Sequence, residues 1–112
     1  MDDFNVLKEV PFNKLTPAES ERLALLIEEA GEVIQAATKV LRHGWNSYDP
    51  TLPPGKAMSN RASLEKEMGH YEHATRRMFS AVDVDCTIVG HYCDRKADTI
   101  GQWMHHQPDS QK

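Results

Sequence analysis

The sequence predicts an all-α fold, an antiparallel helix bundle of three long helices with a short N-terminal arm, completed by oligomerisation. Apolar residues recur at spacings of three and four over three stretches of the chain, as they do on a helix that buries one face. Two breaks separate these stretches, the first rich in proline and glycine and the second acidic. No run with the alternating pattern of a strand is long enough to build a sheet.

The first helix is predicted from Pro17 to about Arg42. Thr16 is a hydroxyl N-cap, proline follows at the first helical position and Glu19 stands at the third, a combination typical of a capping box. Gly44 provides a C-terminal stop. The apolar stripe of this helix consists of Leu23, Leu26, Ile27, Ala30, Val33, Ile34, Ala37, Val40 and Leu41.

Residues 44–59 are predicted to form a long loop, because three prolines and two glycines exclude a regular element. Loops of this length in a compact domain tend to be either functional or disordered. Two large aromatic residues, Trp45 and Tyr48, favour a functional loop.

A second helix is predicted to begin at Ser59 or Asn60 and to end before an acidic break at residues 83–85. Its core face consists of Leu64, Met68, Tyr71, Thr75, Met78, Phe79 and Val82. Asp85 can cap a third helix. The stripe of that helix consists of Ile88, Val89, Tyr92, Cys93, Lys96 or Ala97, Ile100, Trp103 and Met104. Residues 1–15 are expected to form an irregular or short helical arm, and residues 107–112 a frayed tail.

Length and charge narrow the classes of function. The 112 residues suffice for one small domain, expected to span residues 1–112. Thirteen Lys and Arg against 17 Asp and Glu give a formal net charge of −4, the wrong sign for a general nucleic-acid binder. No apolar stretch approaches the roughly 20 residues of a membrane span, and Met1-Asp2-Asp3 is unlike a basic signal-peptide start. We expect a cytoplasmic protein that binds neither nucleic acid nor membrane.

The apolar stripes are wider than three helices can cover, so a homodimer or a dimer of dimers is expected. The two cysteines, Cys86 and Cys93, are two helical turns apart, too far for a disulfide within one helix. We expect both to be buried as small hydrophobic residues.

Three carboxylates crowd the middle of the first helix. Glu29 and Glu32 are three residues apart, and Glu28 and Glu32 four, so the side chains can converge where like charges destabilise a helix. Apolar neighbours flank Glu29 and Glu32 at the turns before and after. Carboxylates in such surroundings need partners or a metal ion. The alternative is a solvated acidic face.

The second helix carries Glu67 and His70, also three residues apart and close to its core stripe. An antiparallel first helix would present Glu29 and Glu32 opposite this pair, which makes a cluster of four candidate metal ligands. Taken alone, Glu67 and His70 would be read as a surface pair.

Glu29-x-x-Glu32, a spacer of 34 residues and Glu67-x-x-His70 resemble the split motif of the all-α nucleoside triphosphate pyrophosphohydrolases, the MazG-like and dCTP pyrophosphatase-like proteins. The second half of that motif ends in Asp, where this chain has His70, and the spacer is somewhat long. Three further segments are similar to phage and bacterial MazG-like proteins: Leu41-Arg42-His43-Gly44-Trp45 before a proline-containing loop, Asn60 ahead of Leu64-Glu65-Lys66-Glu67-Met68-Gly69, and Asp94-Arg95-Lys96. The resemblance covers about residues 16–104.

The resemblance implies hydrolysis of a nucleoside triphosphate between the α and β phosphates, with Mg²⁺ held by helix carboxylates in the cytoplasm, or in the host cytoplasm for a phage protein. Magnesium suits such carboxylates because it prefers oxygen ligands and bridges substrate phosphates. Glu28 and Glu29 are the candidate catalytic residues, since an uncoordinated carboxylate can take the proton of an attacking water. His70 favours Mn²⁺ or another softer metal over Mg²⁺. It also leaves open a catalytically weakened, nucleotide-binding or regulatory member of the fold.

Seven residues are candidates for binding the substrate. The cations Lys39, Arg42 and Lys96 could reach a phosphate, although each is also an ordinary solvated side chain. Trp45 could stack on a base that His43 or Asn60 hydrogen-bonds; equally, Trp45 could anchor the loop and Asn60 cap the second helix. Asp94 is either a surface acid or a contact to Lys96 or to substrate.

Overall fold

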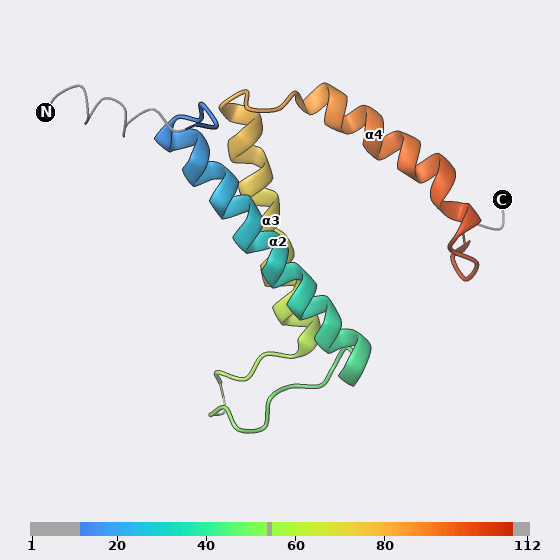
Figure 1. Cartoon of the computed structure of the whole chain (residues 1–112). Helices are drawn as coiled ribbons and strands as arrows, with labels where there is room; N and C mark the ends of the chain where they lie inside the picture. Colours follow the sequence, from blue (N-terminus) through green and yellow to red (C-terminus); the bar gives the residue numbers. More distant parts are fainter. Residues whose placement is uncertain (1–11, 54, 109–112) are drawn as a thin grey trace, which may run out of the picture. The chain divides into compact units, whose positions relative to one another are not determined.

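The computed structural model describes residues 12–53 and 55–108 of the chain (Figure 1). These residues form three α-helices, and no strand occurs within the two ranges. The helices are α2 (Pro17–His43), α3 (Asn60–Ser80) and α4 (Cys86–Thr99), followed by a short 3₁₀ helix, η1 (Ile100–Gln102). The predicted all-α class is therefore confirmed.

The chain divides into two compact units, Met1–Met78 and Phe79–Lys112. The first contains α2 and nearly all of α3, and the second contains α4 and η1. The single domain and the three-helix bundle expected from the sequence stay predictions.

Both ends of α2 lie close to the predicted positions. The Thr16 hydroxyl accepts a hydrogen bond from the Glu19 N–H (3.1 Å), and the Glu19 carboxylate accepts one from the Thr16 N–H (2.8 Å). These two bonds complete the capping box. At the other end Gly44 has a φ of 89°, a left-handed conformation that favours glycine, and its N–H donates to the Val40 carbonyl (2.8 Å). The helix extends one residue beyond the predicted Arg42, to His43.

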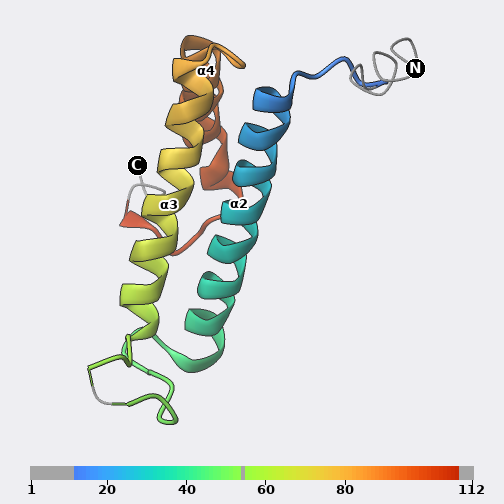
Figure 2. The same cartoon turned by 90° about the vertical axis from the view of Figure 1, so that its left-hand side faces the viewer.

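Within the first unit, α2 and α3 lie side by side and run in opposite directions (Figures 1 and 2). Ala36 of α2 and Ala74 of α3 are both buried, and Met78 is the third buried apolar residue among those described. Small side chains at such positions let two helix backbones approach closely. The pair is thus held by a narrow core, and many larger apolar side chains stay exposed.

The start of α3 differs in detail from one sequence-based alternative. The Ser59 hydroxyl accepts a hydrogen bond from the Ala62 N–H (3.1 Å), so Ser59 caps the helix and Asn60 is its first residue. The Asn60 amide instead donates to the Gly44 carbonyl (3.1 Å) and, at 3.4 Å, to the Lys39 carbonyl. The alternative in which Asn60 caps the second helix is therefore wrong.

The end of α3 also falls earlier than its apolar stripe suggested. The helix ends at Ser80, and Val82 lies in the following turn with a φ of 59°, exposed to solvent. Its N–H donates to the Phe79 carbonyl (3.0 Å), a hydrogen bond that closes a turn and places Val82 off the core face expected for it.

In the second unit, α4 begins as predicted, because the Asp85 carboxylate accepts a hydrogen bond from the Thr87 N–H (2.8 Å). The α-helix ends at Thr99, so Trp103 and Met104 lie beyond η1 instead of on a continuous stripe. Cys86 and Cys93 are free, and both are exposed, so the expected burial of these residues is wrong. No residue of α4 is buried.

The predicted arm and tail lie largely outside the described residues, which exclude 1–11 and 109–112. Of the arm, residues 12 and 13 lie in a turn, Lys14 has a left-handed φ of 61°, and the Leu15 N–H donates to the Asn13 side chain (3.1 Å). Among the helices of the described ranges, none has the length and the apolar character needed to span a bilayer.

Candidate metal centre

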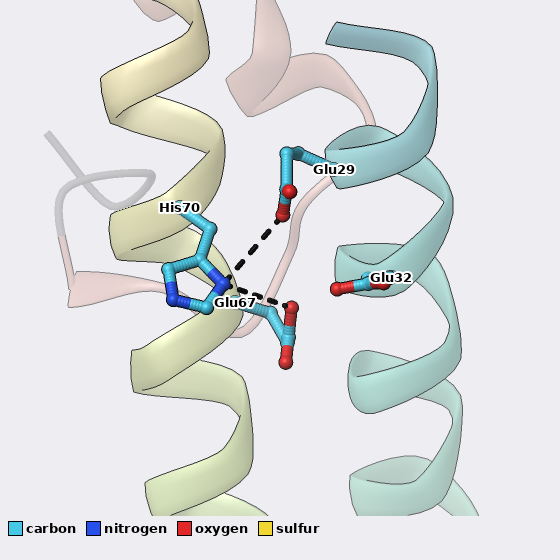
Figure 3. A group of neighbouring side chains, drawn as sticks. All are labelled: Glu29, Glu32, Glu67 and His70. Carbon is cyan, nitrogen blue, oxygen red and sulfur yellow. Dashed lines mark ion pairs between the residues drawn. The ribbon is translucent and has the colours of Figure 1, made fainter. Parts of the chain in front are cut away.

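Glu29 and Glu32 lie one turn apart on α2, and Glu67 and His70 lie one turn apart on α3. Because the two helices run in opposite directions, the two pairs meet between them (Figure 3). One ligand atom from each of these four residues lies within 4.8 Å of the others. The expected convergence of the four side chains is therefore present, while their role as metal ligands stays a prediction.

The separation of these atoms is close to what a metal ion requires. Ligands on opposite sides of an octahedral Mg²⁺ are about 4.2 Å apart, since each metal–oxygen bond is about 2.1 Å. The observed spread of 4.8 Å is only slightly wider.

His70 joins the two helices through its Nδ1 atom. This atom lies 3.6 Å from Oε2 of Glu29 and 3.6 Å from Oε2 of Glu67 (Figure 3). Both distances are too long for hydrogen bonds. The imidazole is 53% exposed, whereas each of the two carboxylate side chains is 13% exposed. The histidine therefore forms the open side of the cluster.

Two buried oxygen atoms have no donor. With the carboxyl groups ionised, Oε2 of Glu29 and Oε2 of Glu67 are buried and accept no hydrogen bond from any described residue. Buried polar atoms in native proteins are nearly always paired, and a charged atom most of all. Both atoms belong to the predicted ligand set. The donor set and its unsatisfied oxygens thus fit a bound divalent cation.

Like-charge repulsion changes the acidity of the cluster. A hydrogen bond to Glu67 and the negative charge of Glu67 raise the pKa of Glu32 above its ordinary 4.5, with smaller contributions from burial and from Glu29 and Glu28. The same hydrogen bond lowers the pKa of Glu67, assisted by Lys66, whose Nζ lies 3.5 Å from Oε1 of Glu67. The neighbours of Glu32 thus favour its protonated form, whereas a bound cation would favour the ionised carboxylate.

Glu28 is exposed on α2, one turn before Glu32, and is not one of the four converging residues. Its charge nevertheless contributes to the raised pKa of Glu32, so it lies within electrostatic reach of the cluster. A carboxylate in that position can accept a proton without being a ligand.

Three of the predicted substrate-binding residues, Lys39, His43 and Asn60, line one cavity of about 640 Å³. The cavity lies where the end of α2, the loop of residues 44–59 and the start of α3 meet, and we call it the loop cavity. Arg42 does not line it but borders a shallower depression, together with Lys39 and His43.

Trp45 has a partner that the sequence did not suggest. The Arg61 guanidinium lies 4.7 Å from the centroid of the Trp45 ring, within the range of a cation–π contact. This contact attaches the start of the loop to α3. It supports the alternative in which Trp45 anchors the loop, and it occupies a ring face on which a base would stack.

Asp94 and Lys96 lie on α4 in the second unit, and both are exposed. Lys96 borders a shallow depression with Tyr92, Arg95 and Thr99. The contribution of Asp94 and Lys96 to substrate binding stays a prediction.

The sequence analysis missed other residues of the loop cavity, notably Lys56, Lys66 and Ser63. Lys66 stands beside Glu67 in the sequence, and that adjacency was a usable signal. Lys56 and the Trp45–Arg61 contact had none, because each depends on how the loop folds back.

Glu32→Gln tests the like-charge repulsion in the metal-free protein. Because folding raises the pKa of Glu32, the stability that this residue contributes is present below pH 4.5 and is lost as the pH rises through the raised value. Glutamine resembles the protonated form and does not lose that contribution. The quantity to measure is the Tm of the variant minus the Tm of wild type, both in chelator. We expect this difference to be more positive at about pH 7 than at about pH 4.

The control is Glu21→Gln, an exposed change on the same helix, expected to alter stability by less than about 0.5 kcal/mol. Added Mn²⁺ should raise the Tm of wild type and of Glu21→Gln but not that of Glu32→Gln. A Glu32→Gln variant that melts several degrees below wild type at neutral pH would show that Glu32 stabilises the fold through an ion pair.

Comparison with known proteins gave no relative. No protein-family model, no curated protein and no solved structure matches the chain. The grounds for a function are therefore the four converging residues, their neighbours and the resemblance of the split motif in the sequence.

Proposed function

We propose that the protein is a metal-dependent nucleoside triphosphate pyrophosphohydrolase, which cleaves its substrate between the α and β phosphates to a nucleoside monophosphate and pyrophosphate. The observation that carries this proposal is the cluster of Glu29, Glu32, Glu67 and His70, with two buried carboxylate oxygens that have no donor. A divalent cation would satisfy these oxygens and at the same time attract an anionic substrate. A nucleotide substrate implies the cytoplasm as the place of action.

Each charged residue of the cluster has a part in this proposal. Glu29, Glu32, Glu67 and His70 would hold Mg²⁺ or Mn²⁺. The bound metal supplies Lewis-acid chemistry, in that it neutralises phosphate charge and makes a nearby water more acidic. Glu28, exposed beside the cluster, is placed to take the proton of the attacking water, and Glu29 is the second candidate for that role.

Cations near the cluster would hold the phosphates. Lys39 follows Glu32 by seven residues on α2, about 10 Å along the same helix face. Arg42 lies near the end of α2 and is exposed. We include Trp45, Asp94 and Lys96 in the proposed binding site on the strength of the sequence resemblance.

A second candidate is a nucleotide-binding or regulatory protein of the same fold with weakened catalysis. The observation that favours it is His70, because a neutral imidazole brings no negative charge to a site that would otherwise hold a fourth carboxylate. Hard ions such as Mg²⁺ bind less well to such a donor set than Mn²⁺ does.

We also propose that the protein assembles as a homodimer or a dimer of dimers. Ile27, Ile34 and Leu41 recur every seven residues along one side of α2, and each side chain is at least 66% exposed. On α4 the apolar residues Ile88 and Tyr92 are exposed as well. Exposed large apolar side chains that recur along one side of a helix are typical of an interface.

The proposed activity is tested by pyrophosphate release from a panel of ribo- and deoxynucleoside triphosphates, each with Mg²⁺ or Mn²⁺. We expect at least one nucleotide to be hydrolysed to the monophosphate. Glu67→Gln removes a charged ligand and should lower the rate at least about a hundredfold, whereas Glu21→Gln should retain it. If the folded wild-type protein hydrolyses no nucleotide with either metal, the proposed enzymatic activity is rejected.

In that case, the melting temperature separates the remaining possibilities. A nucleotide that raises the Tm identifies the nucleotide-binding protein, because a ligand stabilises the state to which it binds. If no nucleotide shifts the Tm, the remaining possibility is a helical assembly module whose acidic cluster binds no ligand.

His70→Asp tests the unusual member of the cluster. Wild type should be more active with Mn²⁺ than with Mg²⁺, and the added anionic oxygen should move the preference toward Mg²⁺. If the site has lost catalytic power, the same variant should gain activity. The matched control is His73→Asp, an exposed change one turn further along α3, which should alter neither property. Unchanged metal preference and rate in both His70→Asp and His70→Ala would make His70 a bystander.

The assembly is tested by light scattering coupled to gel filtration. At micromolar concentration the particle mass should be two or four times the 12.7 kDa of one chain. Ile34→Glu places a charge in the apolar stripe and should lower the mass to that of one chain, whereas the exposed neighbour change Gln35→Glu should not. A monodisperse wild-type monomer would contradict the proposal.

A further inference from the structure

The loop cavity is large enough for a small organic ligand. Its volume of about 640 Å³ falls within the roughly 300–1,000 Å³ of typical ligand sites. Three lysines, Lys39, Lys56 and Lys66, line it, together with the ring of Tyr48 and the apolar side chains of Leu52 and Met58. This combination suits a molecule that has an anionic part and an apolar or aromatic part.

The charge of the cavity is opposite to that of the chain. Asp49 is its single lining carboxylate, against three lysines, in a protein whose formal net charge is −4. The Asp49 Oδ1 accepts hydrogen bonds from the Thr51 N–H (2.9 Å) and hydroxyl (2.6 Å), which hold the pKa of Asp49 below its usual value. Within the described part of the chain, Lys39 and Lys56 form no ion pair. The charge of Lys39 also contributes to the lowered pKa of Asp49, so this carboxylate offsets part of one lysine charge and the lining keeps a net positive charge.

The helix register brings the cavity next to the candidate metal centre. On α2, Lys39 follows Glu32 by seven residues, and on α3, Asn60 precedes Glu67 by seven. Seven residues are two turns, or about 10 Å, and return to the same side of a helix. Lys66, which pairs with Glu67 at 3.5 Å, borders both regions. A ligand in the loop cavity therefore lies within about two helical turns of the carboxylate cluster, with Lys66 beside both.

The backbone at the neck of the loop is tied to α3. The Asn60 N–H donates to the Ser47 carbonyl (2.8 Å), and the Arg61 N–H donates to the Trp45 carbonyl (2.9 Å). The Asn60 side chain and the Trp45–Arg61 contact add to these bonds. A cavity wall that is held in this way before a ligand arrives loses less entropy on binding.

We propose that the loop cavity seats a nucleotide, with its phosphates on Lys39, Lys56 and Lys66 and its base against Tyr48, Leu52 and Met58. The nucleotide as ligand class rests on the proposed function. The lysine contacts themselves need no metal. The cavity is therefore a second anchor, which holds the substrate independently of the carboxylate cluster and contacts the part that differs between nucleotides.

Calorimetric titration of the full chain in chelator tests this proposal, with inorganic triphosphate and the four common deoxynucleoside triphosphates as probes. Without metal, both kinds of probe should bind, and at least one nucleotide should bind more tightly than inorganic triphosphate. Lys39→Gln and Lys56→Gln should each raise the dissociation constant about tenfold, equivalent to about 1.4 kcal/mol. Lys14→Gln, a matched loss of charge before the start of α2, should leave it unchanged.

Tyr48→Leu separates the two parts of the ligand. It should weaken binding of the nucleotide and leave that of inorganic triphosphate unchanged, because the ring would contact only the base. Circular dichroism of each variant checks the fold, and these side chains are exposed, so the substitutions should leave it intact.

The outcomes distinguish this proposal from the enzyme activity. Metal-free binding that is weakened in both lysine variants supports the proposal that the nucleotide binds in the loop cavity, even if no nucleotide is hydrolysed. Absence of metal-free binding, or equal binding in wild type and both lysine variants, overturns it, even if hydrolysis with Mn²⁺ is normal. Inorganic triphosphate that binds as tightly as every nucleotide overturns the assignment of the base to Tyr48.

Discussion

The close approach of three carboxylates between α2 and α3 is the constraint on which the electrostatics of the first unit depends. Glu29, Glu32 and Glu67 meet between the two helices, and Oε2 of Glu29 and Oε2 of Glu67 accept no hydrogen bond from a described residue. A sequence selected only for stability would replace such carboxylates, because like charges at these spacings oppose folding. The contact between Glu32 and Glu67 raises the pKa of Glu32 and lowers that of Glu67, so the two carboxyl groups do not ionise independently. A divalent cation would relieve the repulsion, and for this reason the cluster is the candidate metal site among the described residues.

The first unit separates two kinds of charge along the same pair of helices. Carboxylates gather at the middle of α2 and α3, and Lys39, two turns beyond Glu32, lines the loop cavity together with Lys56. A carboxylate can approach an anion only through a cation, whereas a lysine can contact it directly. The candidate metal ligands and the candidate phosphate contacts are thus different residues, and Lys66 lies beside both groups.

Local patterns made most of the fold readable from the sequence. The capping box at Thr16, the glycine at position 44 and the cap at Asp85 each act within a few residues, and all three are found where the sequence indicated them. The three-residue spacings of the cluster likewise needed only helix geometry and an antiparallel neighbour. What could not be read depends on contacts between distant segments, such as Arg61 on Trp45, Asn60 on the loop carbonyls and Lys56 in the cavity wall. The early end of α3 at Ser80 depends on a single turn at Val82, for which apolar periodicity contains no information.

The bonds at the neck of the loop have a consequence for how such a protein can change over evolutionary time. The backbone N–H groups of Asn60 and Arg61 bind the carbonyls of Ser47 and Trp45, so hydrogen bonds close the two ends of the intervening loop against each other. Insertions, deletions and exchanges within it need not be transmitted to the helices that carry Glu29 and Glu67. The entropy of closing such a loop also grows only slowly with its length. The segment between Ser47 and Asn60 can therefore vary in length and composition while α2 and α3 keep the four converging side chains together.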